Sequence, residues 1–267
     1  MSDAGPLVVC LAAAVLYALG GRGRRRVGRE LAFYAGVASV LAVLEPPFDG
    51  WADTSFTLHM TQHVVLLTVA PPLLVLGRPW PRLWLPFPLR VRRAAARGLA
   101  GSAAFRLAGR TLTRPAVALA VMSATIGAWH VPALYDAAVR HQGIHVLEHV
   151  TFLFTALLYW GPLLETPPVR ARIDHLRRAA WFAAAMVPGW VLAVVLAFAS
   201  TPLYGAYAEL AHRPGGLSAL ADQQLAAGVM WVPGSLAYLI AGFLSVYRWL
   251  EPDTILEPSR PEELSLT

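Results

Sequence analysis

Seven apolar segments, separated by polar or basic stretches, constrain the fold of this chain more than any other feature. A helix needs about 20 apolar residues to cross the hydrocarbon core of a bilayer, which is about 30 Å thick. Only helices and closed barrels satisfy their backbone polar groups there. The pattern therefore predicts an all-α, polytopic integral membrane bundle with seven transmembrane helices. The segments are residues 6–20, 31–45, 56–77, 116–136, 144–165, 179–202 and 225–250, of which the first two are short and are expected to extend into their flanks.

The composition agrees with a membrane protein. Hydrophobic residues make up 57% of the chain and charged residues only 14%, whereas a typical soluble domain is about 25% charged. We expect a single membrane domain over residues 1–250 and a disordered cytoplasmic tail over residues 251–267, which is polar and rich in proline. Cys10 is the single cysteine, so one chain can form neither a disulfide nor a Cys-x-x-Cys site.

The arginines predict the orientation of the bundle. All 22 basic residues are arginine, and 20 of them lie in the loops 20–30, 78–115 and 166–178 or near the C-terminal end. Only Arg140 and Arg213 fall on the other side. Because basic loops stay in the cytoplasm, the N-terminus is expected outside and the C-terminus inside.

The loop 78–115 contains nine arginines interleaved with aromatic residues such as Trp80, Trp84 and Phe105. This mixture is typical of a segment that lies at the lipid interface. Anionic lipid headgroups explain the net charge of +6, and no nucleic-acid partner is expected.

Seven of the eight histidines fall on the predicted outer side. His59 and His63 lie near the start of the third span, and His145 and His149 begin the fifth. Residues four apart lie on one helix face, so each span presents a pair of imidazoles. His130 lies near the outer end of the fourth span, His141 and His212 lie in outer loops, and His175 alone is inside.

Two histidine pairs at one depth can supply the imidazoles of a metal site. The thioethers of Met60, Met122 and Met230 would suit copper, whereas the carboxylates of Glu148 and Asp222 would suit zinc or iron. Structural roles stay open: histidines can form hydrogen bonds between helices, methionines can fill the core and carboxylates can fix histidine tautomers. Residues 222–224, Asp-Gln-Gln, could cap the last helix.

The sequence lacks the common catalytic motifs. It has no zinc-protease His-Glu-x-x-His, no Gly-x-Ser-x-Gly elbow and no phosphate-binding loop. We therefore expect a binding protein and not an enzyme.

An ordered set of motifs resembles the CtaG family of caa3-type cytochrome c oxidase assembly factors, from about residue 30 to residue 250. The motifs are Leu58-His-Met-Thr-Gln-His63, Ala70-Pro-Pro72 with Gly77-Arg-Pro79, Ala128-Trp-His-Val-Pro132, His145-x-x-x-His149, and Asp222-Gln-Gln224 followed by Met230-Trp-Val-Pro-Gly234. The chain is also similar to membrane copper proteins of the CopD type.

The resemblance implies a multi-pass protein of the bacterial plasma membrane that helps assemble cytochrome c oxidase by serving copper delivery. Its partners would be the lipid bilayer, oxidase subunits and other copper chaperones. The oxidase copper centres lie in or above the outer membrane half, at the depth of these histidines. Carried over by motif, the candidate Cu(I) ligands are His59, His63, His130, His145 and His149, with Met60, Glu148, Asp222, Gln223, Gln224 and Met230 as polar or supporting partners.

Three other functions remain open from the sequence. Facing histidines on two helices can hold haem, which would make the protein a membrane electron carrier. A copper transporter would need polar groups that continue to the inner face, where the spans are nearly all Ala, Leu and Val. A scaffold would bind oxidase subunits without metal.

Overall fold

A computed structural model describes residues 5–21, 26–166 and 173–251, and within these ranges the chain forms helices, turns and irregular segments without a strand. The prediction of an all-α fold is confirmed. The tail predicted for residues 251–267 lies outside the described residues except for Glu251.

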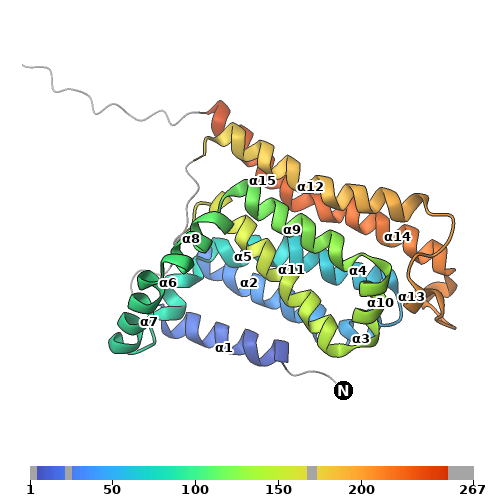
Figure 1. The fold of residues 1–267 in the computed structure, drawn as a ribbon, viewed down its shortest axis with the longest axis horizontal. Coiled ribbons are helices and arrows are strands. Elements are labelled where there is room, and N and C mark those ends of the chain that lie inside the picture. The colour runs from blue at the N-terminus through green and yellow to red at the C-terminus, as the bar shows by residue number, and fades with distance from the viewer. Residues whose placement is uncertain (1–4, 22–25, 167–172, 252–267) are drawn as a thin grey trace, which may run out of the picture.

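The long helices run side by side along the long axis of the molecule (Figure 1). α12 packs against α14 and α15, α2 packs against α5, and α11 packs against α9. These helices are α1 (Gly5–Leu19), α2 (Val27–Leu44), α4 (Phe56–Val64), the π-helical turn η1 (Val65–Val69), α5 (Ala70–Leu76), α9 (Pro115–Trp129), α11 (Gln142–Leu163), α12 (His175–Phe198), α14 (Ala219–Trp231) and α15 (Pro233–Leu250).

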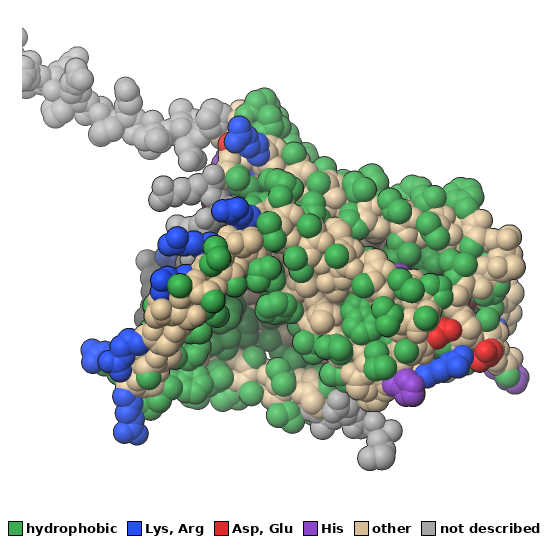
Figure 2. All heavy atoms as spheres, viewed as in Figure 1, with side chains coloured by type: hydrophobic (Ala, Val, Ile, Leu, Met, Phe, Trp, Pro, Cys, Tyr) green, Lys and Arg blue, Asp and Glu red, His purple; other side chains and the backbone are tan. Residues whose placement is uncertain are grey.

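Short helices occupy the two ends of the bundle. One end holds α6 (Pro79–Trp84), α7 (Leu89–Gly101) and α8 (Ala103–Leu112), and arginine side chains gather over this end in Figure 2. The opposite end holds α3 (Phe48–Ala52), α10 (Pro132–Arg140), α13 (Gly205–Ala208) and the 3-10 turn η2 (Pro214–Gly216). We call them the α6–α8 end and the α10–α13 end.

Five helical stretches of the described chain are long and apolar enough to cross a membrane, or six if α8 and α9, which meet at an angle of 81°, form one span. α1 and α9 have 15 residues each, and at 1.5 Å per residue such a helix is about 22 Å long. Each of the seven apolar segments is largely helical, but the segment predicted over residues 116–136 is interrupted at His130 and Val131, between α9 and α10. The count of seven spans and the side on which each terminus lies remain predictions. The five are Val27–Leu44, Phe56–Leu76, Gln142–Leu163, His175–Phe198 and Ala219–Leu250.

The outer surface of the helices is apolar. Phe198 is 82% exposed and Phe243 is 70% exposed, and Figure 2 shows hydrophobic side chains covering the sides of the bundle between its two ends. An exposed apolar area of this extent marks contact with a membrane or a partner. Together with the apolar helices, it makes this a membrane protein.

Candidate metal centre

α4 carries two histidines, and its first turn is held by a residue from another helix. Asp222 of α14 is buried, and its carboxylate accepts hydrogen bonds from the backbone N–H groups of Phe56 (2.8 Å) and Thr57 (3.0 Å) and from the hydroxyls of Ser55 and Thr57. A carboxylate at a helix N-terminus satisfies free N–H groups and complements the helix dipole. Asp222 thus fixes where α4 begins, one turn before His59.

A π-helical turn begins shortly after His63. Pro71 and Pro72 have no N–H to donate to the preceding turn, and the carbonyl of Leu67 instead accepts a hydrogen bond from the Trp160 indole N–H at 3.1 Å. Turns of this kind inside α-helices are frequent at functional sites. The turn η1 begins two residues after His63 and lies between the histidine-bearing part of the segment and α5.

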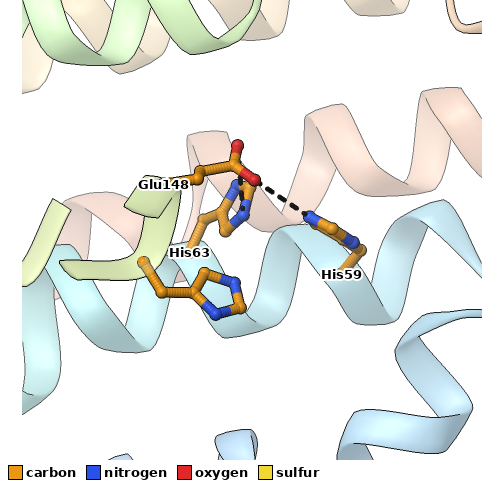
Figure 3. A group of neighbouring side chains, drawn as sticks. His59, His63 and Glu148 are labelled. Atoms are coloured by element: carbon orange, nitrogen blue, oxygen red, sulfur yellow. Dashed lines mark ion pairs between the residues drawn. The ribbon is translucent and has the colours of Figure 1, made fainter. Parts of the chain in front are cut away.

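Three histidines and one glutamate converge in the core. Each of His59 and His63 from α4 and Glu148 and His149 from α11 offers a donor atom, and these atoms lie within 4.8 Å of one another. Figure 3 shows the Glu148 carboxylate pointing toward both rings of α4, with oxygen–Nε2 distances of 4.0 Å to His59 and 3.6 Å to His63. We call these four residues the His–Glu cluster.

The other two predicted ligands border this cluster. The ring of His145 lies 4.1 Å from that of His149 and 5.0 Å from that of His59, measured between centroids. The ring of His130, which caps the end of α9, lies 6.0 Å from that of His63. The structure therefore brings together all five histidines that the sequence singled out.

The nitrogens that face the cluster have no hydrogen-bond partner. The Nε2 atoms of all five histidines and both carboxylate oxygens of Glu148 are buried and without a hydrogen bond. In folded proteins the large majority of buried polar side-chain atoms are hydrogen-bonded. So many exceptions in one place make this a candidate ligand site, since imidazole nitrogen and carboxylate oxygen are donor atoms that metal ions accept.

The hydrogen bonds on the other side of two rings select the ligating tautomer. The Tyr207 hydroxyl donates to the Ala52 carbonyl (2.8 Å) and lies 2.7 Å from Nδ1 of His59. Its one proton is already used, so His59 Nδ1–H must donate to the tyrosine oxygen, which leaves the lone pair on Nε2. His130 makes the equivalent contact from Nδ1 to the Ile126 carbonyl at 2.8 Å. Such outer partners are typical of metal-binding histidines.

Comparison with known protein families gives a match over most of the chain. Residues 13–251 match the family described as cytochrome c oxidase caa3 assembly factor. The chain belongs to this family. The match includes every residue of the His–Glu cluster.

The curated relatives are longer proteins from mycobacteria. The chain is 24% identical over 253 residues to uncharacterised proteins of Mycobacterium bovis and Mycobacterium tuberculosis, alignments that cover 90% of this chain and 38% of each relative. It is 21% identical over 244 residues to an uncharacterised protein of Mycobacterium leprae, covering 85% of this chain and 35% of the relative. The chain thus spans less than two fifths of the length of these relatives. No solved structure matches it.

Several of the predicted polar partners have roles away from the cluster. Asp222 does not contact the histidines and does not cap its own helix, where Ser218 is the N-cap, but caps α4. The Gln223 amide donates to the Leu196 carbonyl (3.0 Å) and accepts from the Leu203 N–H (2.7 Å). The exposed Gln224 donates to the Ala197 carbonyl. These residues tie α14 to α4 and to the end of α12.

Met60 and Met230, the two methionines proposed as supporting residues, have different surroundings. Met60 is fully buried in an apolar cluster that includes Phe56 and Ala226, as expected for a packing residue. Met230 lines a small cavity together with His63 and His130. The exposed His141 and His212 are not among the clustered residues.

Sequence reasoning missed the tyrosines that surround the site. Tyr207 of α13 contacts His59, and the buried ring of Tyr135 from α10 lies 5.4 Å from the His59 ring and 5.9 Å from the His130 ring. Tyr207 is separated from His59 by 148 residues, and no helical spacing relates them. Only the fold of the α10–α13 end could reveal the contact.

Proposed function

We propose that this assembly factor binds Cu(I) at the His–Glu cluster in the bacterial plasma membrane and delivers it to cytochrome c oxidase. The observation that carries the proposal is the convergence of His59, His63 and His149 on the Glu148 carboxylate. The Nε2 atoms of these three histidines, and of the bordering His130 and His145, are all buried without a hydrogen bond. Family membership supplies the oxidase as the partner. The role is binding and transfer, without catalysis, and other copper chaperones would supply the ion.

The proposed topology has seven spans, with the N-terminus and the α10–α13 end outside. The support is the arginine distribution, with 20 of the 22 on one predicted side. α1 and α9 would complete the seven by crossing a bilayer that thins locally around short helices. The cluster then lies in the outer half of the membrane, at the depth of the oxidase copper centres.

Two considerations favour copper over other metals. The site offers several imidazoles, and the proposed partner, cytochrome c oxidase, is a copper enzyme. Imidazole suits copper, zinc and iron, while the harder carboxylate of Glu148 by itself favours zinc or iron. A factor that serves a copper enzyme needs ligands that exchange, unlike the closed four-ligand sites of structural zinc. Five available imidazoles provide more donors than one Cu(I) requires, which allows stepwise exchange.

The dimensions of the site disfavour haem. The His59 and His63 rings are 4.5 Å apart, and the cavity beside them has a volume of about 50 Å³, whereas pockets for small organic ligands start at about 300 Å³. Transport across the membrane is also disfavoured, because α5 beyond the π turn offers only apolar side chains over Ala70–Leu76.

The first test is the metal content of detergent-purified protein prepared under reducing conditions. We expect about one Cu(I) or more per chain, no Soret band, and loss of copper in His59→Ala/His63→Ala and in His145→Ala/His149→Ala. His141→Ala/His212→Ala is the matched control, because both residues are exposed histidines of the same end and should leave copper binding unchanged.

Other outcomes would overturn the proposal. Full copper stoichiometry in the cluster variants, or zinc binding with no affinity for Cu(I), would exclude the copper assignment. A Soret band would favour the electron carrier. Metal-free protein whose cluster variants still restore oxidase activity in a deletion strain would be a scaffold.

A further inference from the structure

A small cavity adjoins the His–Glu cluster and has a different set of donors. Its volume is about 50 Å³, enough for an ion and a few waters, because one water needs about 10–15 Å³ by this measure. It lies between η1, α9, α12 and the α14–α15 junction. Its potential ligands are His63, His130, Met186 and Met230, and we call it the methionine cavity.

The two histidines present free lone pairs to this region. Both ring nitrogens of His63 are buried without a hydrogen bond. His130 uses Nδ1 on the Ile126 carbonyl, and its buried Nε2 has no hydrogen-bond partner. Two imidazoles with two thioethers form a softer donor set than the His–Glu cluster, and soft sulfur ligands select Cu(I).

Methionine is scarce in this chain, which makes the arrangement informative. There are five methionines in all; Met186 and Met230 line the cavity. A third, Met122, is fully buried, and its Sδ lies 3.9 Å from the hydroxyl of Tyr238, which also lines the cavity. Packing alone can be served by any apolar residue, whereas thioether sulfur binds a soft ion.

The cavity reaches the side of the bundle at Gly189. This glycine of α12 is partly exposed, and a Cβ added to it would have no atom within 4 Å. Its neighbours Val187 and Val191 are 51% and 59% exposed, as lipid-facing residues are. The cavity therefore lies next to an open position on the lateral surface.

We propose that the methionine cavity is a second, Cu(I)-selective site that receives the ion from the His–Glu cluster and releases it sideways past Gly189. This inference rests on the proposed function and names the path of the same ion. His63 belongs to both sites, so the ion exchanges Glu148 and His149 for thioether ligands while His63 stays bound. Copper remains Cu(I) throughout, and no electron or proton is transferred.

The structure explains why the transfer site lies here. Three of the four walls contain an interruption of regular helix: the π turn η1, Pro188 within α12, and Pro233 at the start of α15. Proline removes a backbone hydrogen bond and keeps neighbouring turns apart. At the α15 wall the Ser235 hydroxyl donates to the Trp231 carbonyl (2.5 Å) and accepts from the Trp190 indole (2.8 Å), so polar groups there are satisfied and leave the sulfurs as donors.

The test is X-ray absorption and Cu(I) competition on full-length protein with Met186→Leu/Met230→Leu. Leucine conserves volume and apolar character, so the bundle should fold. We expect wild-type protein to show copper–sulfur scattering and the variant to lose it, with at least a tenfold lower Cu(I) affinity and unchanged Zn²⁺ affinity at the His–Glu cluster. Met60→Leu is the matched control, because Met60 is fully buried and does not line the cavity.

A second variant tests the exit. Gly189→Leu should keep Cu(I) stoichiometry and slow its release to a soluble chelator at least tenfold, while Gly228→Leu, another helical glycine with open space, should not. Copper bound through nitrogen and oxygen only, or release unaffected by Gly189→Leu, would overturn the methionine path and leave the cluster intact. Copper absent from wild-type protein would instead reject the proposed function itself.

Discussion

At the scale of single residues, the site is defined by polar atoms that the protein leaves unsatisfied. A buried polar group without a hydrogen bond costs about 1–3 kcal/mol, and here six imidazole nitrogens and two carboxylate oxygens share this condition. A bound ion would recover much of this cost. We therefore expect the apoprotein to be less stable than the loaded form, since a ligand that binds only the folded state stabilises it.

Tyr207 provides the residue-scale prediction. Tyr207→Phe removes the oxygen that accepts from His59 Nδ1–H, so His59 loses the partner that keeps its lone pair on Nε2. Loss of such outer partners lowers metal affinity by about 10–100-fold, and we expect a decrease of this size in a Cu(I) competition assay. Tyr159→Phe is the control, because its buried hydroxyl donates to the Trp181 carbonyl away from the cluster. Equal affinities in the two variants would contradict the tautomer argument.

The sequence predicted that the histidines lie close together, but it did not predict their surroundings. Helical spacing relates His59 to His63 and His145 to His149. This local geometry does not depend on how the rest of the chain packs. Glu148 was expected as a supporting carboxylate, or as a ligand if the metal is zinc or iron, and it lies inside the cluster. Its place depends on the rotation of α11 relative to α4, which long-range packing decides.

At the scale of elements, α4 is positioned by its ends. Asp222 holds its N-terminus, and the π turn with Pro71 and Pro72 sets its exit. The sequence predicted one continuous helix over residues 56–77 and could not reveal the turn, since a proline within an apolar run is compatible with a kink, a π turn or a break. It also could not show that Asp222 reaches another helix, because an aspartate early in a helix normally caps its own N-terminus.

The element-scale prediction concerns this cap. Asp222→Ala leaves the N–H groups of Phe56 and Thr57 buried without an acceptor, at a cost of about 1–3 kcal/mol each. We expect a lower unfolding temperature in detergent and weaker metal binding, because His59 and His63 move with α4. Asp174→Ala is the control: Asp174 caps α12 from an exposed position, so its loss should cost about 0.5–2 kcal/mol and leave metal affinity unchanged. Unchanged metal affinity in Asp222→Ala would show that α4 is held by packing alone.

At the scale of the whole molecule, two chemistries occupy opposite ends of one apolar bundle. Arginine side chains cluster over α6–α8 (Figure 2), and the histidines lie toward the α10–α13 end, where Tyr135 and Tyr207 contact them. α7 and α8 have no buried residue, and the position of this segment at the lipid interface stays a prediction. The number of spans was harder to predict. The first segment was already expected to be short, but hydropathy does not reveal that the apolar segment 116–136 is interrupted after Trp129, so that α9 has only 15 residues.

The orientation of the bundle decides whether the proposed delivery is possible, and the single cysteine makes it measurable. In a Cys10→Ala background, one new cysteine is introduced at each end in turn, as His212→Cys or as Arg97→Cys; both positions are exposed. We expect a membrane-impermeant maleimide added to intact spheroplasts to label His212→Cys, and to label Arg97→Cys only after the membrane is permeabilised. The reverse pattern would place the His–Glu cluster in the cytoplasmic half of the bilayer. Copper bound there could not pass sideways to an oxidase centre in the outer half without crossing the apolar layer formed by α5. The delivery proposal would then be wrong, and the protein would have a function on the cytoplasmic side.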